Sequence, residues 1–152
     1  MKIVIAGGGS VGVAIATDLA ERNHDIIILE QSGDAIAKLR EHIQSPNVKI
    51  EQCDACEVKS LARAGIQSAD VMIAATGDDE DNLVVSWLAR SQFGIGRVIA
   101  RVNNSRNNWL FNEAWGVDVA VSIPTLITSL VDEVVEVGSV DRKSTRLNSS
   151  HT

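Results

Sequence analysis

The 152-residue sequence contains no tyrosine, three histidines and two cysteines, and it has no long apolar segment. Without tyrosine, a Tyr–Lys pair for hydride transfer is excluded. The longest apolar segments are far shorter than the ~20 residues that a bilayer span needs. The glycines at positions 7–9 interrupt the first apolar segment too early for a signal peptide. We therefore expect neither membrane insertion nor secretion, and we expect both cysteines to be reduced thiols.

Basic residues are also few, since 14 Lys and Arg stand against 20 Asp and Glu, giving a formal net charge of −6 and a pI of about 5.0. This excess of negative charge argues against nucleic acid as a partner, because the phosphate backbone would be repelled. Apolar residues make up 45% of the chain and charged residues 22%, a balance that supports a packed core and excludes global disorder. The length fits one domain.

The last twelve residues, 141–152, differ from the rest of the chain. They are polar and basic, contain one apolar residue and show no periodicity. We expect a disordered segment, and residues 141–151 resemble the conceptual translation of a sequencing-library adapter. We therefore interpret 141–152 as a non-native tail and residues 1–140 as the domain. On this interpretation, the natural chain continues beyond residue 140.

Short β-branched apolar segments alternate with segments of helical period along residues 1–140. The pattern predicts strands at 2–6, 25–30, 48–52, 71–75, 98–102 and 117–121. It predicts helices at 11–22, 33–43, 57–64, 79–93, 105–115 and 124–137, the last ended by Gly138. The third strand alternates in polarity, which is typical of a sheet edge. Six strands alternating with six helices predict an α/β fold with a parallel sheet.

Residues 7–12 fit the pattern G-x-G-x-x-G between a strand and a helix, and Glu30 ends the next strand. In this context Gly7 permits a tight turn, Gly9 lets a pyrophosphate approach the backbone, and Gly12 permits close helix–sheet packing. Free amides and the positive end of the helix dipole would face the phosphates. The sequence therefore predicts a Rossmann-like, doubly wound six-stranded sheet with strand order 3-2-1-4-5-6.

Glu30 can accept hydrogen bonds from an adenosine ribose and would repel a 2′-phosphate, which favours NAD or an adenine nucleotide over NADP. Further ligand contacts should lie where the other strands end, at the same edge of the sheet. The residues predicted there are Asp54, Ala55, Thr76, Gly77 and Arg101. Arg101 either places a cation near a phosphate or forms an ion pair with the acidic residues 78–81.

These segments, with residues 74–83 and 98–103, resemble the nucleotide-binding domain of the Trk potassium-uptake regulatory subunit (TrkA) family, also called the RCK or KTN domain. The resemblance covers residues 1 to about 140. It implies a domain that is not an enzyme, binds NAD(H) or ATP/ADP, and forms homo-oligomers, as dimers within a tetrameric ring. It also implies docking on the cytoplasmic face of a membrane potassium-translocating subunit. The ligand contacts implied are Gly7, Gly8, Gly9, Ser10, Val11, Glu30, Thr76, Gly77 and Arg101, with Asp54 and Ala55 beside them and Gly12 completing the motif.

The sequence departs from the family at two points within the domain. Many members have Arg where Ser10 stands, and Ser10 offers one neutral hydrogen bond, which favours a dinucleotide over ATP. Cys53 and Cys56 form a C-x-x-C between a strand and a helix, where a helix N-terminus would lower a thiol pKa. Because a zinc site would need two more ligands, we predict no metal. We interpret the acidic residues 78–81 as a helix cap rather than a cation site.

Two other functions remain open alongside the regulatory one. A small NAD-dependent oxidoreductase would need acid–base residues, but His24 and His42 do not lie at strand ends, and we predict no catalytic residue. A redox-sensing thiol switch would use Cys53 and Cys56. We expect part of the apolar face of the last helix to pack on the sheet, and its numerous apolar positions indicate either further core packing or a partner surface. We expect a cytoplasmic regulatory domain in which the bound nucleotide biases the orientation of subunits.

Overall fold

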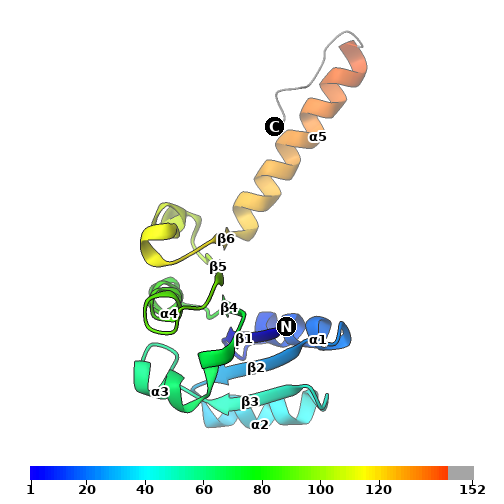
Figure 1. Cartoon of the computed structure of the whole chain (residues 1–152). Coiled ribbons are helices and arrows are strands. Elements are labelled where there is room, and N and C mark those ends of the chain that lie inside the picture. Colours follow the sequence, from blue (N-terminus) through cyan, green and yellow to red (C-terminus); the bar gives the residue numbers. More distant parts are fainter. Residues whose placement is uncertain (144–152) are drawn as a thin grey trace.

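The computed structural model describes residues 1–143, with side chains described for residues 1–138. Its strands form a parallel sheet of six, in the order β3-β2-β1-β4-β5-β6 (Figure 1). The strands are β1 (Lys2–Ala6), β2 (Asp25–Glu30), β3 (Val48–Gln52), β4 (Val71–Ala74), β5 (Arg97–Arg101) and β6 (Val119–Val121). The α-helices are α1 (Ser10–Glu21), α2 (Gly33–His42), α3 (Val58–Arg63), α4 (Asp79–Ser91) and α5 (Ile123–Lys143), and the 3-10 helices are η1 (Ile66–Ser68), η2 (Ser105–Leu110) and η3 (Glu113–Trp115). The predicted fold and strand order are confirmed, and β3 lies at an edge.

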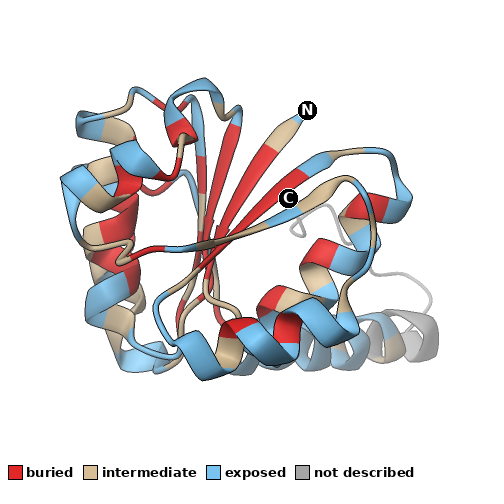
Figure 2. Cartoon of the chain, turned by 90° about the horizontal axis from the view of Figure 1, so that it is seen from below, coloured by how far each residue is buried: buried red, intermediate tan, exposed pale blue. Residues whose placement is uncertain are grey.

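The sheet is buried on both faces because successive side chains of its central strands enter two separate cores (Figure 2). Ile5 and Ile28 pack on the side of α1 and α2, whereas Val4 and Leu29 pack on the side of α3 and α4. Each such fully buried side chain contributes about 1.5–3 kcal/mol to folding. The two cores thereby fix the carboxyl ends of β1, β2 and β4, where the connections to α1, α2 and α4 begin.

The helix predicted for 105–115 is wrong, because two short 3-10 helices, η2 and η3, occupy this segment. Asparagine side chains explain the break. Asn104 accepts a hydrogen bond from the backbone amide of Arg106, and Asn112 accepts one from the backbone amide of Ala114. Such local bonds compete with helical ones. Gly116 then ends η3 in the left-handed conformation, with a φ of +78°.

The last helix differs from the prediction in two respects. It does not end at Gly138 but continues to Lys143, which is physically admissible because an interior glycine costs a helix only about 1 kcal/mol. The expected packing of part of this helix on the sheet is also wrong, since α5 projects away from the body (Figure 1). Up to residue 138, where side chains are described, its large apolar side chains are exposed by 45–72%; they are Ile123, Leu126, Ile127, Leu130, Val131, Val134, Val135 and Val137.

The expected tail, 141–152, lies outside the described residues from position 144 onward, and residues 141–143 form the end of α5. Its non-native origin therefore stays a prediction. Among the described residues, no helix combines the length and the apolar character needed to cross a bilayer.

Candidate functional site

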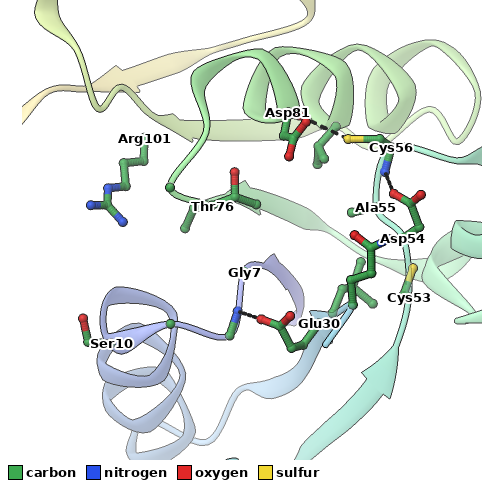
Figure 3. A pocket seen from close by; sticks show the side chains of 17 residues that line it. Gly7, Ser10, Glu30, Cys53, Asp54, Ala55, Cys56, Thr76, Asp81 and Arg101 are labelled. Carbon is green, nitrogen blue, oxygen red and sulfur yellow. Dashed lines mark hydrogen bonds between the residues drawn. The ribbon is translucent and has the colours of Figure 1, made fainter. Parts of the chain in front are cut away.

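A crevice of about 380 Å³ lies at the carboxyl edge of the sheet, between the connections that follow β1 to β5 (Figure 3). Ten of the twelve residues predicted for the site line it: Gly7, Gly8, Gly9, Ser10, Glu30, Asp54, Ala55, Thr76, Gly77 and Arg101. The other two, Val11 and Gly12, lie in α1 and are not part of the lining. The structure therefore brings ten of the predicted residues together around one cavity, while their contact with a ligand stays a prediction.

Two glycines of the G-x-G-x-x-G pattern are required by the protein itself. Gly7 has a φ of +119°, a conformation that residues with a side chain rarely adopt. A Cβ at Gly12 would lie 1.9 Å from the carbonyl oxygen of Gly7, so α1 could not approach the turn as it does. Both roles agree with the tight turn and the close packing predicted for these positions.

Gly9 differs from these glycines because nothing inside the protein requires it. Its backbone is extended, with φ −76° and ψ −172°, and a Cβ there would meet no atom within 4 Å. It is the N-cap of α1, without a side-chain cap, and the first turn of α1 contains no acidic side chain. The free amides and the positive end of the helix dipole are thus left uncompensated beside an open space, an arrangement that fits a phosphate group.

Glu30 ends β2 and turns its carboxylate toward the glycine turn. Its Oε1 accepts a hydrogen bond from the backbone amide of Gly8 at 3.0 Å, and its Oε2 accepts one from the backbone amide of Ser32 at 2.8 Å. A Cβ at Gly8 would lie 2.7 Å from the Leu39 Cδ1 atom and 2.9 Å from Oε1, so a side chain at position 8 would disturb the carboxylate. The carboxylate is held in one orientation at the crevice wall. Each of its oxygens keeps a second lone pair, which can accept a hydrogen bond from a ribose hydroxyl.

The turn after β3 places Asp54 and Ala55 at the wall, and the two flanking cysteines also line the crevice. The Cys53 sulfur accepts a hydrogen bond from the Ser60 hydroxyl at 3.4 Å, whereas the Cys56 sulfur lies 3.8 Å from the carbonyl oxygen of Asp81. The two thiols thus face different elements, α3 and α4.

The expectation that a helix N-terminus lowers a thiol pKa in this C-x-x-C is wrong. Burial raises the pKa of Cys53, although the hydrogen bond from Ser60 opposes the change. Burial, reinforced by the nearby carboxylates of Asp81 and Asp54, raises the pKa of Cys56 to about 12. Both cysteines are therefore protonated at neutral pH, which disfavours a redox or metal-binding dithiol.

Thr76 lines the crevice, but its polar groups face α4 rather than the cavity. Its backbone amide donates to the Asn82 side-chain oxygen at 2.9 Å, and its hydroxyl lies 2.7 Å from the same oxygen. The Asn82 side-chain nitrogen donates to the carbonyl oxygens of Thr76 at 3.0 Å and of Arg101 at 2.9 Å. Fully buried Asn82 therefore holds the ends of β4 and β5 together, a role that its sequence position in a helical first turn did not predict.

Arg101 is half-buried at the crevice, and among the described residues it forms no ion pair within 4.0 Å. The alternative in which it pairs with the acidic residues 78–81 is therefore wrong for the described part of the chain. Asp78 caps α4 as predicted, because its carboxylate accepts a hydrogen bond from the backbone amide of Asp81 at 3.0 Å. The described residues contain no group of three or more His, Cys, Asp or Glu side chains suited to hold a metal ion.

Seven lining residues lie outside the predicted set: Leu29, Gln31, Cys53, Cys56, Ala75, Asp81 and Val85. Five of them adjoin predicted residues in sequence, so extending each strand end by one residue would have found them. Asp81 and Val85 could not be found in this way, because they belong to the helix α4, which borders the crevice. Asp81 is seen there in Figure 3.

The parallel sheet, the glycine turn and the crevice at the carboxyl edge define a Rossmann-like domain of the nucleotide-binding class. The sequence matches the TrkA-N domain over residues 3–123, and the chain belongs to that family. It is 44% identical over 142 residues to the Trk system potassium uptake protein TrkA of Mycobacterium tuberculosis. The match covers 93% of this chain and 63% of that protein, so the chain spans less than two thirds of this relative.

Solved structures of related domains have the same fold. The TrkA-N domain of the inner membrane protein YbaL from Escherichia coli aligns with a TM-score of 0.73 at 18% identity, covering 88% of this chain and 95% of that one. GsuK bound to ADP aligns with a TM-score of 0.68 at 26% identity, covering 89% of this chain and 34% of that one. The GsuK channel bound to NAD aligns with a TM-score of 0.68 at 23% identity, covering 79% and 21%.

Proposed function

We propose that this domain binds an adenine nucleotide in the crevice and serves as the regulatory, nucleotide-sensing part of a potassium uptake system. The observation that carries the proposal is Gly9, a glycine with ordinary backbone angles whose missing side chain opens onto a bare helix N-terminus. A phosphate placed there would accept backbone hydrogen bonds and benefit from the helix dipole. The potassium uptake protein from M. tuberculosis and the nucleotide-bound GsuK structures support this assignment.

The charges in the crevice favour NAD(H), with ADP or ATP as the second choice. Arg101 is the one cation among the described lining residues, and Glu30, Asp54 and Asp81 are acidic. A dinucleotide carries two phosphate charges and presents ribose hydroxyls to a carboxylate such as Glu30. A triphosphate places more negative charge in the same space, and Ser10 adds no compensating cation. The 2′-phosphate of NADP would meet Glu30 directly.

The same lining favours a regulatory role over the alternative of a small NAD-dependent oxidoreductase. None of the described lining residues is His, Lys or Tyr, the residues most suited to proton transfer beside a nicotinamide at neutral pH. The two lining thiols, Cys53 and Cys56, are protonated. Hydride transfer to a substrate, followed through the absorbance of NADH, would support the oxidoreductase instead.

We further propose that α5 associates with a second copy of this chain and that the assembly docks on the cytoplasmic face of a membrane potassium-translocating subunit. Five residues of α5, Ile127, Leu130, Val131, Val134 and Val135, line a shallow, wholly apolar depression along the exposed helix. Their spacing places them on one face. Because one face of a helix can pair with its own copy around a twofold axis, a dimer is the simplest way to cover this surface.

Sedimentation velocity tests the dimer. Replacing Val134 by Asp puts a charge into the apolar face and should yield monomers at concentrations where the original chain dimerises. Asp132→Asn, on the polar face of the same helix, is the matched control and should leave dimers intact. Monomers of the original chain at all concentrations would contradict the proposal.

Nucleotide binding is tested by calorimetry with NADH, NAD, ADP, ATP and NADP. We expect saturable binding in which NADP is the weakest ligand. The potassium role is tested with the full-length protein and the membrane subunit in proteoliposomes, where potassium flux should depend on the added nucleotide. Flux that is indifferent to nucleotide while binding is intact would refute the regulatory role and leave the binding site standing.

A further inference from the structure

The first turn of α4 is hydrogen-bonded to the connection that follows β5. Asp79 accepts four hydrogen bonds from this connection. Its Oδ1 lies 2.6 Å from the backbone amide and 3.1 Å from the side-chain nitrogen of Asn103. Its Oδ2 lies 3.0 Å from the backbone amide of Asn104 and 2.8 Å from the side-chain nitrogen of Asn107. Asn82 joins this set through the carbonyl oxygen of Thr76, which accepts hydrogen bonds from the side-chain nitrogens of both Asn82 and Asn103. We call the whole set the Asp79 network; its members are Asp79, Asn82, Asn103, Asn104 and Asn107.

At one end the Asp79 network reaches the crevice. The side-chain nitrogen of Asn103 donates to the carbonyl oxygen of Thr76 at 3.0 Å. That of Asn82 donates to the carbonyl oxygen of Arg101 at 2.9 Å. Thr76 and Arg101 both line the crevice. A ligand that draws the Arg101 side chain toward a phosphate would therefore displace backbone to which the network is bonded.

At its other end the network reaches α5. Asn107 and Asn108 are consecutive in η2, and the side-chain nitrogen of Asn108 donates to the Thr125 hydroxyl at 2.8 Å. Thr125 lies in the first turns of α5, away from the apolar face defined by Leu130 and Val134. Hydrogen bonds, together with the peptide bond between Asn107 and Asn108, thus connect the crevice wall to the projecting helix through the 3-10 segment η2.

We infer that Asp79 is a positioning residue that couples occupancy of the crevice to the orientation of α5. The inference rests on the proposed function, because it needs a nucleotide in the crevice. Burial alone would raise the pKa of Asp79, but the bonds from Asn103, Asn107 and Asn104 outweigh it and lower the pKa. The carboxylate is therefore charged at neutral pH, and bonds to a charged acceptor are about twice as strong as neutral ones. Coupling through such a network is reciprocal, so a change in α5 also changes nucleotide affinity.

The final link is tested by Thr125→Val, which removes the acceptor of Asn108 and keeps the side-chain shape. Thr128→Val is the matched control, because the Thr128 hydroxyl bonds only within α5 among the described residues, to the carbonyl oxygen of Pro124. Calorimetry with NADH should show saturable binding in all three chains, so that the exchange of each is compared at saturating nucleotide. Hydrogen exchange of residues 123–138, with and without NADH, should show a nucleotide-dependent change that is at least halved in Thr125→Val and kept in Thr128→Val.

The first link is tested by Asp79→Asn, with Glu80→Gln as its control, because Glu80 is exposed in the same helical turn and lies outside the network. In Asp79→Asn the amide hydrogen exchange of residues 105–110 should no longer depend on nucleotide. In Glu80→Gln the same exchange should still depend on nucleotide. If the original chain binds nucleotide and its exchange at 105–110 and 123–138 does not respond, the coupling is refuted and the proposed function survives. If Thr125→Val responds like the original chain, the route through Asn108 is refuted. If no nucleotide binds at all, the proposed function fails first.

Discussion

Replacing Gly9 by valine tests whether this glycine is required for nucleotide binding rather than for folding. The extended backbone at Gly9 accepts a β-branched residue, and a Cβ there meets no protein atom within 4 Å. Because valine is a poorer N-cap than glycine, we expect the free energy of unfolding to fall by only about 1 kcal/mol. The added side chain would instead occupy the space through which a phosphate approaches the first turn of α1.

The loss of affinity follows from the hydrogen bonds that the valine prevents. A backbone hydrogen bond to a charged group contributes about 1.5–3 kcal/mol. Losing two of them weakens binding by about 3–6 kcal/mol, or about a hundredfold to ten-thousandfold in Kd. Calorimetry with NADH measures the affinity, and urea denaturation measures the stability of the same sample.

Gly96→Val is the matched control, because Gly96 is an exposed glycine outside the crevice at which a Cβ would also meet nothing within 4 Å. It should bind nucleotide like the original chain. If Gly9→Val binds NADH within about threefold of the original chain while folded, no phosphate lies against this turn and the reasoning from Gly9 is wrong.

Three further predictions follow from other residues. Glu30→Gln should weaken NAD binding by about tenfold and reduce the discrimination against NADP, both measured by calorimetry, because the substitution removes a charged acceptor for the ribose; unchanged discrimination would count against Glu30. Cys56, with its pKa raised to about 12, should react with iodoacetamide at pH 8 about a thousandfold more slowly than an ordinary thiol, as followed by mass spectrometry, and fast alkylation would contradict the burial argument. Asp79, whose pKa is lowered by hydrogen bonds that outweigh its burial, stabilises the fold above its unfolded pKa of about 3.9 and loses this contribution as the pH falls through its folded pKa. The stability of Asp79→Asn, from urea denaturation, should thus fall less steeply below about pH 4 than that of the original chain; equal slopes would refute the assignment.

The fold was predictable from sequence because its determinants are local. Apolar β-branched segments specify buried parallel strands, and the glycines at 7, 9 and 12 specify the first turn and, through it, the strand order. The crevice was predictable for the same reason, since parallel strands bring their carboxyl ends to one edge. Residues adjacent to those ends, such as Glu30 and Thr76, therefore meet without any long-range information.

Other features depend on tertiary contacts that a periodic pattern does not contain. The sequence pattern after β5 predicts a helix. In the structure the backbone amides of Asn103 and Asn104 donate hydrogen bonds to the Asp79 carboxylate, and 3-10 helices follow instead. The sequence pattern indicates an ordinary polar helix residue at Asn82, but this side chain is fully buried between the ends of β4 and β5. The pKa of Cys56 is raised by burial and by carboxylates of other elements. The apolar face of α5 has the spacing expected of a helix packed on the sheet. A helix packed on a partner has the same spacing of apolar residues, so the sequence does not distinguish the two.

The claim on which the account depends is that an adenine nucleotide lies with its phosphates on the turn after β1 and its ribose on Glu30. Nuclear magnetic resonance of the labelled chain, titrated with NADH, tests it residue by residue. We expect saturable amide shifts that are largest at residues 7–11 and extend to Glu30, Asp54 and Ala55. Shifts that are absent at millimolar NADH, NAD, ADP and ATP, or that are centred elsewhere on the molecule, would contradict it.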